Sequence, residues 1–168
     1  MADRDASIAG WIPSLRRYAL GLTGNREAAD DLVQETMERA WRRLAFWRGE
    51  GELRAWLFSI LHNAFIDRLR AEKRSPTQAL AEDEELPVRA TQEDLLHVRD
   101  LDRSLLALAP EQREVLLMVA VEQMSYAEVA RALDIPMGTV MSRLSRARAR
   151  LRAVLEGRDT STRLKAVK

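Results

Sequence analysis

The chain has 168 residues, of which 46% are hydrophobic and 32% charged, and it contains no cysteine. This composition suits one medium domain or two small ones, and it excludes a disulfide framework and a thiolate metal site. No apolar run approaches the roughly 18 residues of a membrane span, and the opening MADRDASIAGW lacks the apolar stretch of a signal peptide. We therefore expect a cytoplasmic protein that does not insert into a membrane.

The net charge of +1 conceals an uneven distribution of charge along the chain. Residues 1–75 carry +2, residues 76–97 carry −5 and residues 98–168 carry +4. Because local charge and not total charge decides where a polyanion binds, this distribution predicts two basic units joined by an acidic connector.

The first half of the chain has the helical period throughout, with no strand-like alternation. A first helix is expected over about residues 7–22, and Asn25 is expected to cap a second helix that runs to Leu44. The apolar stripe of the second helix is Ala29, Leu32, Val33, Thr36, Met37, Ala40 and Leu44. A third helix is expected from about Leu53 to Arg74. Its inward positions are Leu53, Trp56, Leu57, Ile60, Leu61, Ala64 and Leu69. Trp41 and Trp56 are expected in the core and not stacked on bases.

The second half begins after a linker over residues 75–92, which has two prolines and four consecutive acids. Helical periodicity returns at Glu93 and stops at Pro110, which suits the first position of the next helix. Ser125 and Glu128 then have the spacing of a capping box at the start of a short helix.

The last helix is expected from about Thr139 and is very basic, with five arginines between residues 143 and 152 and no acid among them. Its apolar stripe is Val140, Leu144, Ala147, Leu151 and Val154. A short capped helix, a turn containing Pro136 and Gly138, and a longer helix form a helix-turn-helix, whose second helix enters the DNA major groove. A solvated basic face is the plainer alternative, but the cap, turn and stripe together favour DNA binding.

Two stretches of the chain resemble one protein family, in the order that the family has them. The first stretch is ADDLVQETMERAWRRLAFWRGEGELRAWLFSILHNAFIDRLR, and the second is LALAPEQREVLLMVAVEQMSYAEVARALDIPMGTVMSRLSRARARLR. They resemble region 2 and region 4, respectively, of the extracytoplasmic-function sigma factors of bacterial RNA polymerase. The resemblance implies an all-α fold of two small helical domains, over about 10–75 and 98–155, joined by a flexible acidic linker over 76–97. A flexible tail over 156–168 would follow.

The resemblance also implies three binding surfaces. Core polymerase would contact Asp30, Asp31, Gln34, Glu35, Glu38 and Arg42. Recognition and melting of the promoter −10 element would involve Trp47, Arg48, Gly49, Glu50, Asn63, Arg68, Arg70, Lys73 and Arg74. The −35 element would be read by Thr139, Ser142, Arg143, Ser145, Arg146 and Arg150. Met141 stands where many relatives carry arginine, so a shifted −35 specificity is expected.

The implied partners are bacterial core RNA polymerase, promoter DNA and an anti-sigma factor, with no cofactor and no metal. The sequence contains no glycine-rich phosphate loop, and His62 and His97 are too far apart for an HExxH motif, so no enzyme is expected. A connector of about 22 residues averages only about 25–30 Å as a free coil, whereas elements two turns of DNA apart lie about 60 Å apart. Polymerase would have to stretch it.

Two alternatives remain open at this stage. One is a conventional helix-turn-helix regulator whose N-terminal helices dimerise or sense a ligand. The other is a sigma mimic that titrates a regulator, although a mimic need not keep a DNA-reading helix.

Overall fold

The computed structural model describes residues 8–47, 52–75 and 100–165, with side chains as far as Gly157. Every regular element in these ranges is a helix, which confirms the expected all-α fold. The long helices are α2 (Ile12–Thr23), α3 (Arg26–Leu44), α4 (Leu53–Arg74), α6 (Pro110–Ala120), α7 (Tyr126–Leu133) and α8 (Met137–Lys165). Residues 8–9 and 100–106 are also helical. The acidic connector over 76–97 lies outside the described residues.

Local capping signals place several helix ends where the sequence predicts them. The Asn25 side chain accepts a hydrogen bond from the Ala28 N–H at 2.9 Å and starts α3. Ser125 and Glu128 form both bonds of a capping box, at 3.2 Å and 2.7 Å, and start α7. The Ser125 N–H that Glu128 accepts lowers the pKa of the Glu128 carboxyl. Pro110 is the first residue of α6.

Three helix limits differ from the sequence-based expectation. Helix α2 begins at Ile12 and not near residue 7, because the chain turns at residues 10–11 and Pro13 favours the first helical turn. Helix α8 begins two residues earlier than expected, at Met137. It also continues to Lys165, where a flexible tail was expected from residue 156. No proline interrupts this stretch, and Gly157 costs the helix only about 1 kcal/mol relative to alanine.

Helices α2, α3 and α4 form the N-terminal unit. All seven positions of the predicted α3 stripe are buried, so the period of that helix was interpreted correctly. Helix α2 ends at Thr23, and the next residue, Gly24, caps it with a φ of 67°, in the left-handed region that glycine adopts without strain.

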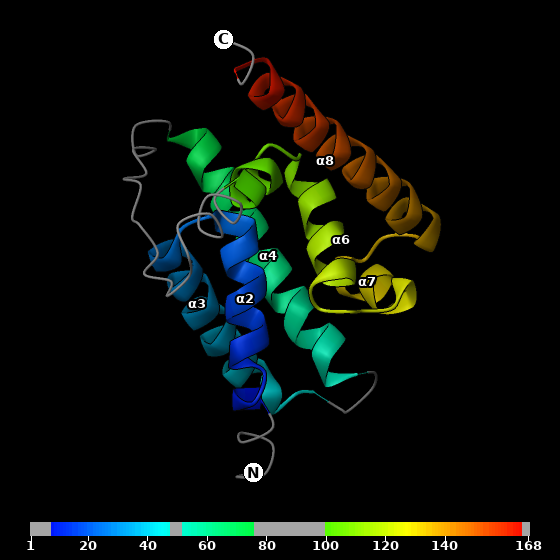
Figure 1. The fold of residues 1–168 in the computed structure, drawn as a ribbon. Helices are drawn as coiled ribbons and strands as arrows, with labels where there is room; N and C mark the ends of the chain where they lie inside the picture. The colour runs from blue at the N-terminus through cyan, green and yellow to red at the C-terminus, as the bar shows by residue number, and fades with distance from the viewer. Residues whose placement is uncertain (1–7, 48–51, 76–99, 166–168) are drawn as a thin grey trace.

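Helices α6, α7 and α8 form the C-terminal unit, and this unit packs directly on the N-terminal one. Figure 1 shows α4 between α2 and α3 on one side and α6 and α7 on the other. The buried side chains of both units form one continuous hydrophobic core. The predicted α4 stripe omitted Phe58 and Phe65, which are 0% and 5% exposed. They are buried because α4 is covered on two sides, and a single amphipathic stripe cannot describe such a helix.

The Asn25 cap allows a test of the start of α3. Replacing Asn25 by alanine removes the acceptor for the Ala28 N–H and should lower the free energy of unfolding by about 1 kcal/mol. Asn25→Asp keeps an acceptor and should leave stability nearly unchanged. Urea unfolding of the two variants measures the difference, and equal losses for both would show that the side-chain cap is unimportant.

Candidate functional site

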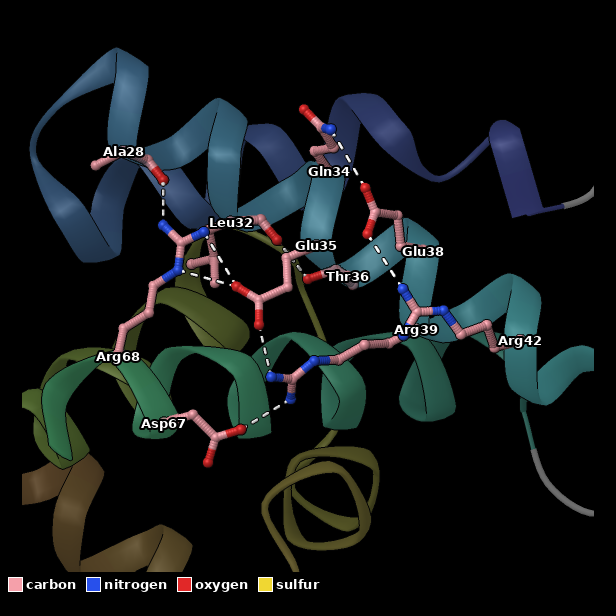
Figure 2. A network of polar contacts seen from close by, with 10 residues as sticks. All are labelled: Ala28, Leu32, Gln34, Glu35, Thr36, Glu38, Arg39, Arg42, Asp67 and Arg68. Carbon is pink, nitrogen blue, oxygen red and sulfur yellow. Dashed lines mark hydrogen bonds and ion pairs between the residues drawn. The ribbon is translucent and has the colours of Figure 1, made fainter. Parts of the chain in front are cut away.

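The exposed face of α3 carries a row of polar side chains that the sequence analysis assigned to polymerase binding. Asp31, Gln34, Glu38 and Arg42 are exposed. Gln34 donates to Glu38 at 3.3 Å, and Arg42 pairs with Glu38 at 3.4 Å. These contacts run along the helix surface and leave the row accessible to a partner (Figure 2).

Two further members of the predicted polymerase surface, Asp30 and Glu35, are half-buried, and each has a partner on another helix. Asp30 pairs with Arg16 of α2 at 2.7 Å. Glu35 pairs with Arg39 at 2.6 Å and accepts two hydrogen bonds from Arg68 of α4, both at 3.1 Å.

The contacts of Glu35 form a network between α3 and α4. Arg39 reaches Asp67 of α4 at 2.9 Å, and Arg68 also donates to the Ala28 carbonyl at 3.2 Å (Figure 2). Glu35 and Arg68 therefore hold two helices together. Arg68 was expected at the −10 surface, and its bonds to Glu35 and to the Ala28 carbonyl are a structural use that the sequence did not predict.

Trp41 is exposed, so the prediction that it lies in the core is wrong. Its exposed fraction is 47%. The apolar stripe is already completed by Ala40 and Leu44, and Trp41 follows Ala40 by about 100° around the helix. It thus lies beside Glu38, three residues earlier, on the polar row. Large exposed aromatic side chains are frequent anchors of protein interfaces, so Trp41 belongs with the candidate polymerase surface.

The candidate −10 surface lies along α4 and the loop before it. Asn63, Arg70, Lys73 and Arg74 are exposed there. Trp47 is half-buried and stacks on Trp56, with ring centroids 5.6 Å apart and planes at 28°. Arg48, Gly49 and Glu50 lie outside the described residues.

The candidate −35 surface lies on α8. Ser145, Arg146 and Arg150 are exposed there, and Thr139, Ser142 and Arg143 are half-buried. Val140, Leu144 and Ala147 are buried on the opposite side. The first three positions of the predicted apolar stripe therefore face the core, and the last two, Leu151 and Val154, are half-buried.

A groove between α7 and α8 adjoins this surface, and the sequence did not predict it. Its volume is about 390 Å³, and it is lined by Tyr126, Met141, Leu144, Ser145, Arg148, Ala149 and Arg152. Met141 is 53% exposed there. Arg148 follows Ser145 by three residues, and Arg152 follows Arg148 by four. This spacing places the three side chains on one face of a helix, so the sequence alone contains the signal for them.

No membrane-crossing helix and no metal cluster occur within the described ranges. None of the helices there is both long and apolar enough to span a bilayer. No group of three or more His, Cys, Asp or Glu side chains gathers there in a way that could hold a metal ion.

Comparisons with known proteins identify the family of the chain. Residues 8–62 match the family model described as the Sigma2 domain of PhyR, and residues 99–151 match Sigma-70, region 4. The ECF RNA polymerase sigma factor EcfG of Rhodopseudomonas palustris is 37% identical over 153 residues, which cover 90% of this chain and 84% of that protein. The chain belongs to the ECF RNA polymerase sigma factor family. Proteins of this family are not enzymes.

Solved sigma factors have the same arrangement of helices. The sigma factor RpoE of Bartonella quintana, solved with the anti-sigma factor NepR, is 30% identical with a TM-score of 0.78, over 93% of this chain and 98% of that one. CnrH, solved with the cytosolic domain of CnrY, is 29% identical with a TM-score of 0.67, over 90% of this chain and 86% of that one. The first likeness extends across both units, so it includes their packing against each other.

Two neighbouring residues of α3, Glu35 and Gln34, allow a test of the network between α3 and α4. Glu35→Ala leaves Arg39 and Arg68 without their shared carboxylate and should lower the free energy of unfolding by about 1–2 kcal/mol. Gln34→Ala makes a similar truncation one residue away and should change stability by less than about 0.5 kcal/mol. Urea unfolding of both variants gives the comparison. Equal stabilities would mean that the network in Figure 2 contributes nothing.

Proposed function

We propose that this sigma factor binds core RNA polymerase and directs transcription initiation from promoters with −10 and −35 elements. The observation that carries the proposal is the presence in one chain of a capped helix-turn-helix with exposed Arg146 and Arg150 and of an exposed polar row on α3. The family to which the chain belongs supports the pairing of a DNA surface with a polymerase surface.

Polymerase binding is assigned to the exposed row of α3. The row offers the carboxylates of Asp31 and Glu38 as hydrogen-bond acceptors and the side-chain amide of Gln34. Trp41 adds an exposed apolar surface beside them. Asp30, Glu35 and Arg42 flank this row. Glu35 contributes chiefly by fixing α3 on α4, because its carboxylate is already shared by two arginines.

Reading of the −35 element is assigned to the outward face of α8. Ser145, Arg146 and Arg150 lie farthest from the core there, and Thr139, Ser142 and Arg143 flank them. Arginine at a base edge pairs bidentately with guanine, whereas at a phosphate it adds affinity without sequence preference. Met141 cannot donate a hydrogen bond, but its exposed side chain suits contact with a thymine methyl group.

Recognition and opening of the −10 element are assigned to α4 and the loop that precedes it. Asn63 is exposed on the polar side of α4 and offers both a donor and an acceptor to an unpaired base. Arg70, Lys73 and Arg74 are exposed in its last turns and suit phosphate contacts. The loop residues Arg48, Gly49 and Glu50 remain part of this proposal, together with Trp47 at its edge.

We place the protein in the cytoplasm, without catalytic activity, and under the control of an anti-sigma factor. Two solved relatives were each captured with such a partner, NepR and CnrY. A helical inhibitor that covers the α3 row or the α8 face would exclude polymerase or DNA by direct competition.

A second function is favoured by one observation, the match of residues 8–62 to the Sigma2 domain of PhyR. PhyR from Bartonella quintana is an anti-anti-sigma factor that was solved with NepR. A protein acting as a sigma mimic would bind an anti-sigma factor without supporting transcription. The basic, exposed face of α8 favours the sigma factor over the mimic.

Run-off transcription decides between these functions. Core polymerase supplemented with the chain should initiate from specific sites in a promoter library, and polymerase alone should not. Arg146→Ala should weaken the promoter interaction by about 1–3 kcal/mol and relax the preference at one −35 position. Arg43→Ala removes an exposed arginine of α3 and serves as the matched control. Failure of the wild-type chain to stimulate any promoter would contradict the sigma function.

The −10 assignment has its own test at Asn63. Asn63→Ala should reduce transcription from duplex promoters, because a captured base would lose its hydrogen-bonding partner. On a template that is already open across the −10 element, no free energy is needed for opening, and only the loss of base capture remains. The transcription defect of Asn63→Ala should therefore be smaller on this template than on the duplex. Permanganate footprinting measures the extent of opening. Equal defects on both templates would indicate a role in folding or in polymerase binding.

A further inference from the structure

Two exposed methionines lie one helical turn apart at the start of α8. Met137 is 52% exposed and Met141 is 53% exposed. Side chains four residues apart lie on the same face of a helix, so the two form one apolar strip, called here the methionine edge. A single exposed apolar side chain is ordinary on a protein surface. These two, however, adjoin each other at the end of the helix whose N-terminal residues meet base edges in a helix-turn-helix.

The turn before α8 and the core behind it hold the methionine edge in one orientation. The Pro136 carbonyl accepts hydrogen bonds from the N–H groups of Thr139 and Val140, at 2.9 Å and 3.2 Å. Val140 and Leu144 are 0% and 2% exposed. Because these two buried side chains fix the rotation of the helix about its axis, the methionine edge stays directed to the surface.

The first six residues of α8 carry no charge. They are MGTVMS, and the first arginine of the helix, Arg143, is half-buried. Methionine has no hydrogen-bond donor. The Ser142 hydroxyl donates to the Thr139 carbonyl at 3.1 Å, so its oxygen remains as an acceptor. Around Met141 the helix therefore offers apolar surface and one hydrogen-bond acceptor.

This chemistry matches thymine among the four bases. In the major groove thymine presents its C5-methyl group, and the adenine paired with it presents an amino donor. Guanine presents two acceptors and no methyl group, so it gains little from a methionine. The flexible, polarisable thioether of methionine adapts its contact to a small apolar group. An A·T pair with its methyl group against Met141 and its amino group at Ser142 suits both side chains.

The charge around the methionine edge favours DNA over an apolar protein surface as the occupant. Residues 137–155 contain no acidic residue. The exposed arginines in this range are Arg146, Arg148, Arg150 and Arg152. Arg148 and Arg152 line the groove of about 390 Å³ together with Met141, so basic side chains border the methionine edge itself. Such a surface attracts a polyanion, whereas an apolar partner would have to bury unpaired charges.

We infer that Met141, with Met137 beside it, reads the C5-methyl group of a thymine in the −35 element and makes thymine the preferred base at that position. Met141 is then a specificity-determining residue, and the arginines around it supply affinity through phosphate contacts. This inference rests on the proposed role of α8 at the −35 element, and it deepens that role by naming the base and the chemical group that is recognised.

Deoxyuridine isolates the contact, because it lacks only the C5-methyl group of thymidine and still pairs with adenine. The full chain with core polymerase first selects promoters from a randomised pool of duplexes. Each thymine of the selected −35 region, on either strand, is then replaced in turn by deoxyuridine. Gel retention measures binding, and run-off assays measure transcription. One replacement should weaken binding of the wild type by about fourfold, as expected for one buried methyl group.

Two variants show whether this sensitivity belongs to the methionine edge. Met141→Gln keeps the length and the helix propensity of the side chain but gives it a polar end. It should bind the thymine and deoxyuridine duplexes equally. Leu155→Gln is the matched control, since it changes an apolar side chain that is 39% exposed on the same helix. It lies about 21 Å farther along α8 and should keep the fourfold difference.

The inference is overturned by a selected −35 region without thymine, or by wild-type binding that is insensitive to deoxyuridine at every position. Equal discrimination by Met141→Gln and the wild type would overturn it as well. A wild type that discriminates where Met141→Gln does not, on duplexes that are never transcribed, would support the inference and contradict the proposed function. Efficient transcription that no deoxyuridine replacement alters would support the proposed function and contradict the inference.

Discussion

The burial of α4 on two sides is the constraint on which the other features of the structure depend. One side packs on α2 and α3, and the other packs on the C-terminal unit. Phe58 lies where these contacts meet, with its ring 5.1 Å from that of Tyr18. Because α4 is fixed in this way, Asn63 and the last basic turns remain at the surface. The polar row of α3 faces away from the shared core.

Structural and functional uses of charge are separated on neighbouring residues. Glu35, Arg39 and Arg68 satisfy one another between two helices, whereas Gln34 and Glu38 bond only along α3. Charge in the C-terminal unit is divided similarly. Glu114 and Glu122 are buried against the N-terminal unit, whereas Arg146, Arg148, Arg150 and Arg152 of α8 are exposed. A net charge near zero therefore coexists with a strongly basic helix α8, because the compensating acids lie elsewhere in the chain.

Features set by neighbours in sequence were predictable, and features set by distant partners were not. The α3 stripe, the Asn25 cap and the Ser125 capping box depend on residues within one or two turns, so spacing was enough. The second buried side of α4 depends on a unit that begins beyond the connector. The exposure of Trp41 follows from its place about 100° around the helix from Ala40, outside the α3 stripe, and this angle is fixed by the sequence spacing alone. Gly21 is a glycine inside a helix, which has an energetic cost; its reason is long-range, since a Cβ atom there would lie 2.8 Å from a Cδ atom of Leu117 in α6.

The proposed function requires the two units to separate when the chain joins a transcribing complex, because one compact body of this chain length is about 40 Å across. The absence of cysteine allows two labels to be placed without other changes, at Ala9→Cys and Ala153→Cys, both exposed and one on each unit. Energy transfer between the labels should report one short distance in the free chain. Core polymerase and promoter DNA should replace it with a longer distance, as the two units move to elements about 60 Å apart. A short distance that persists in a complex that is actively initiating would contradict the account.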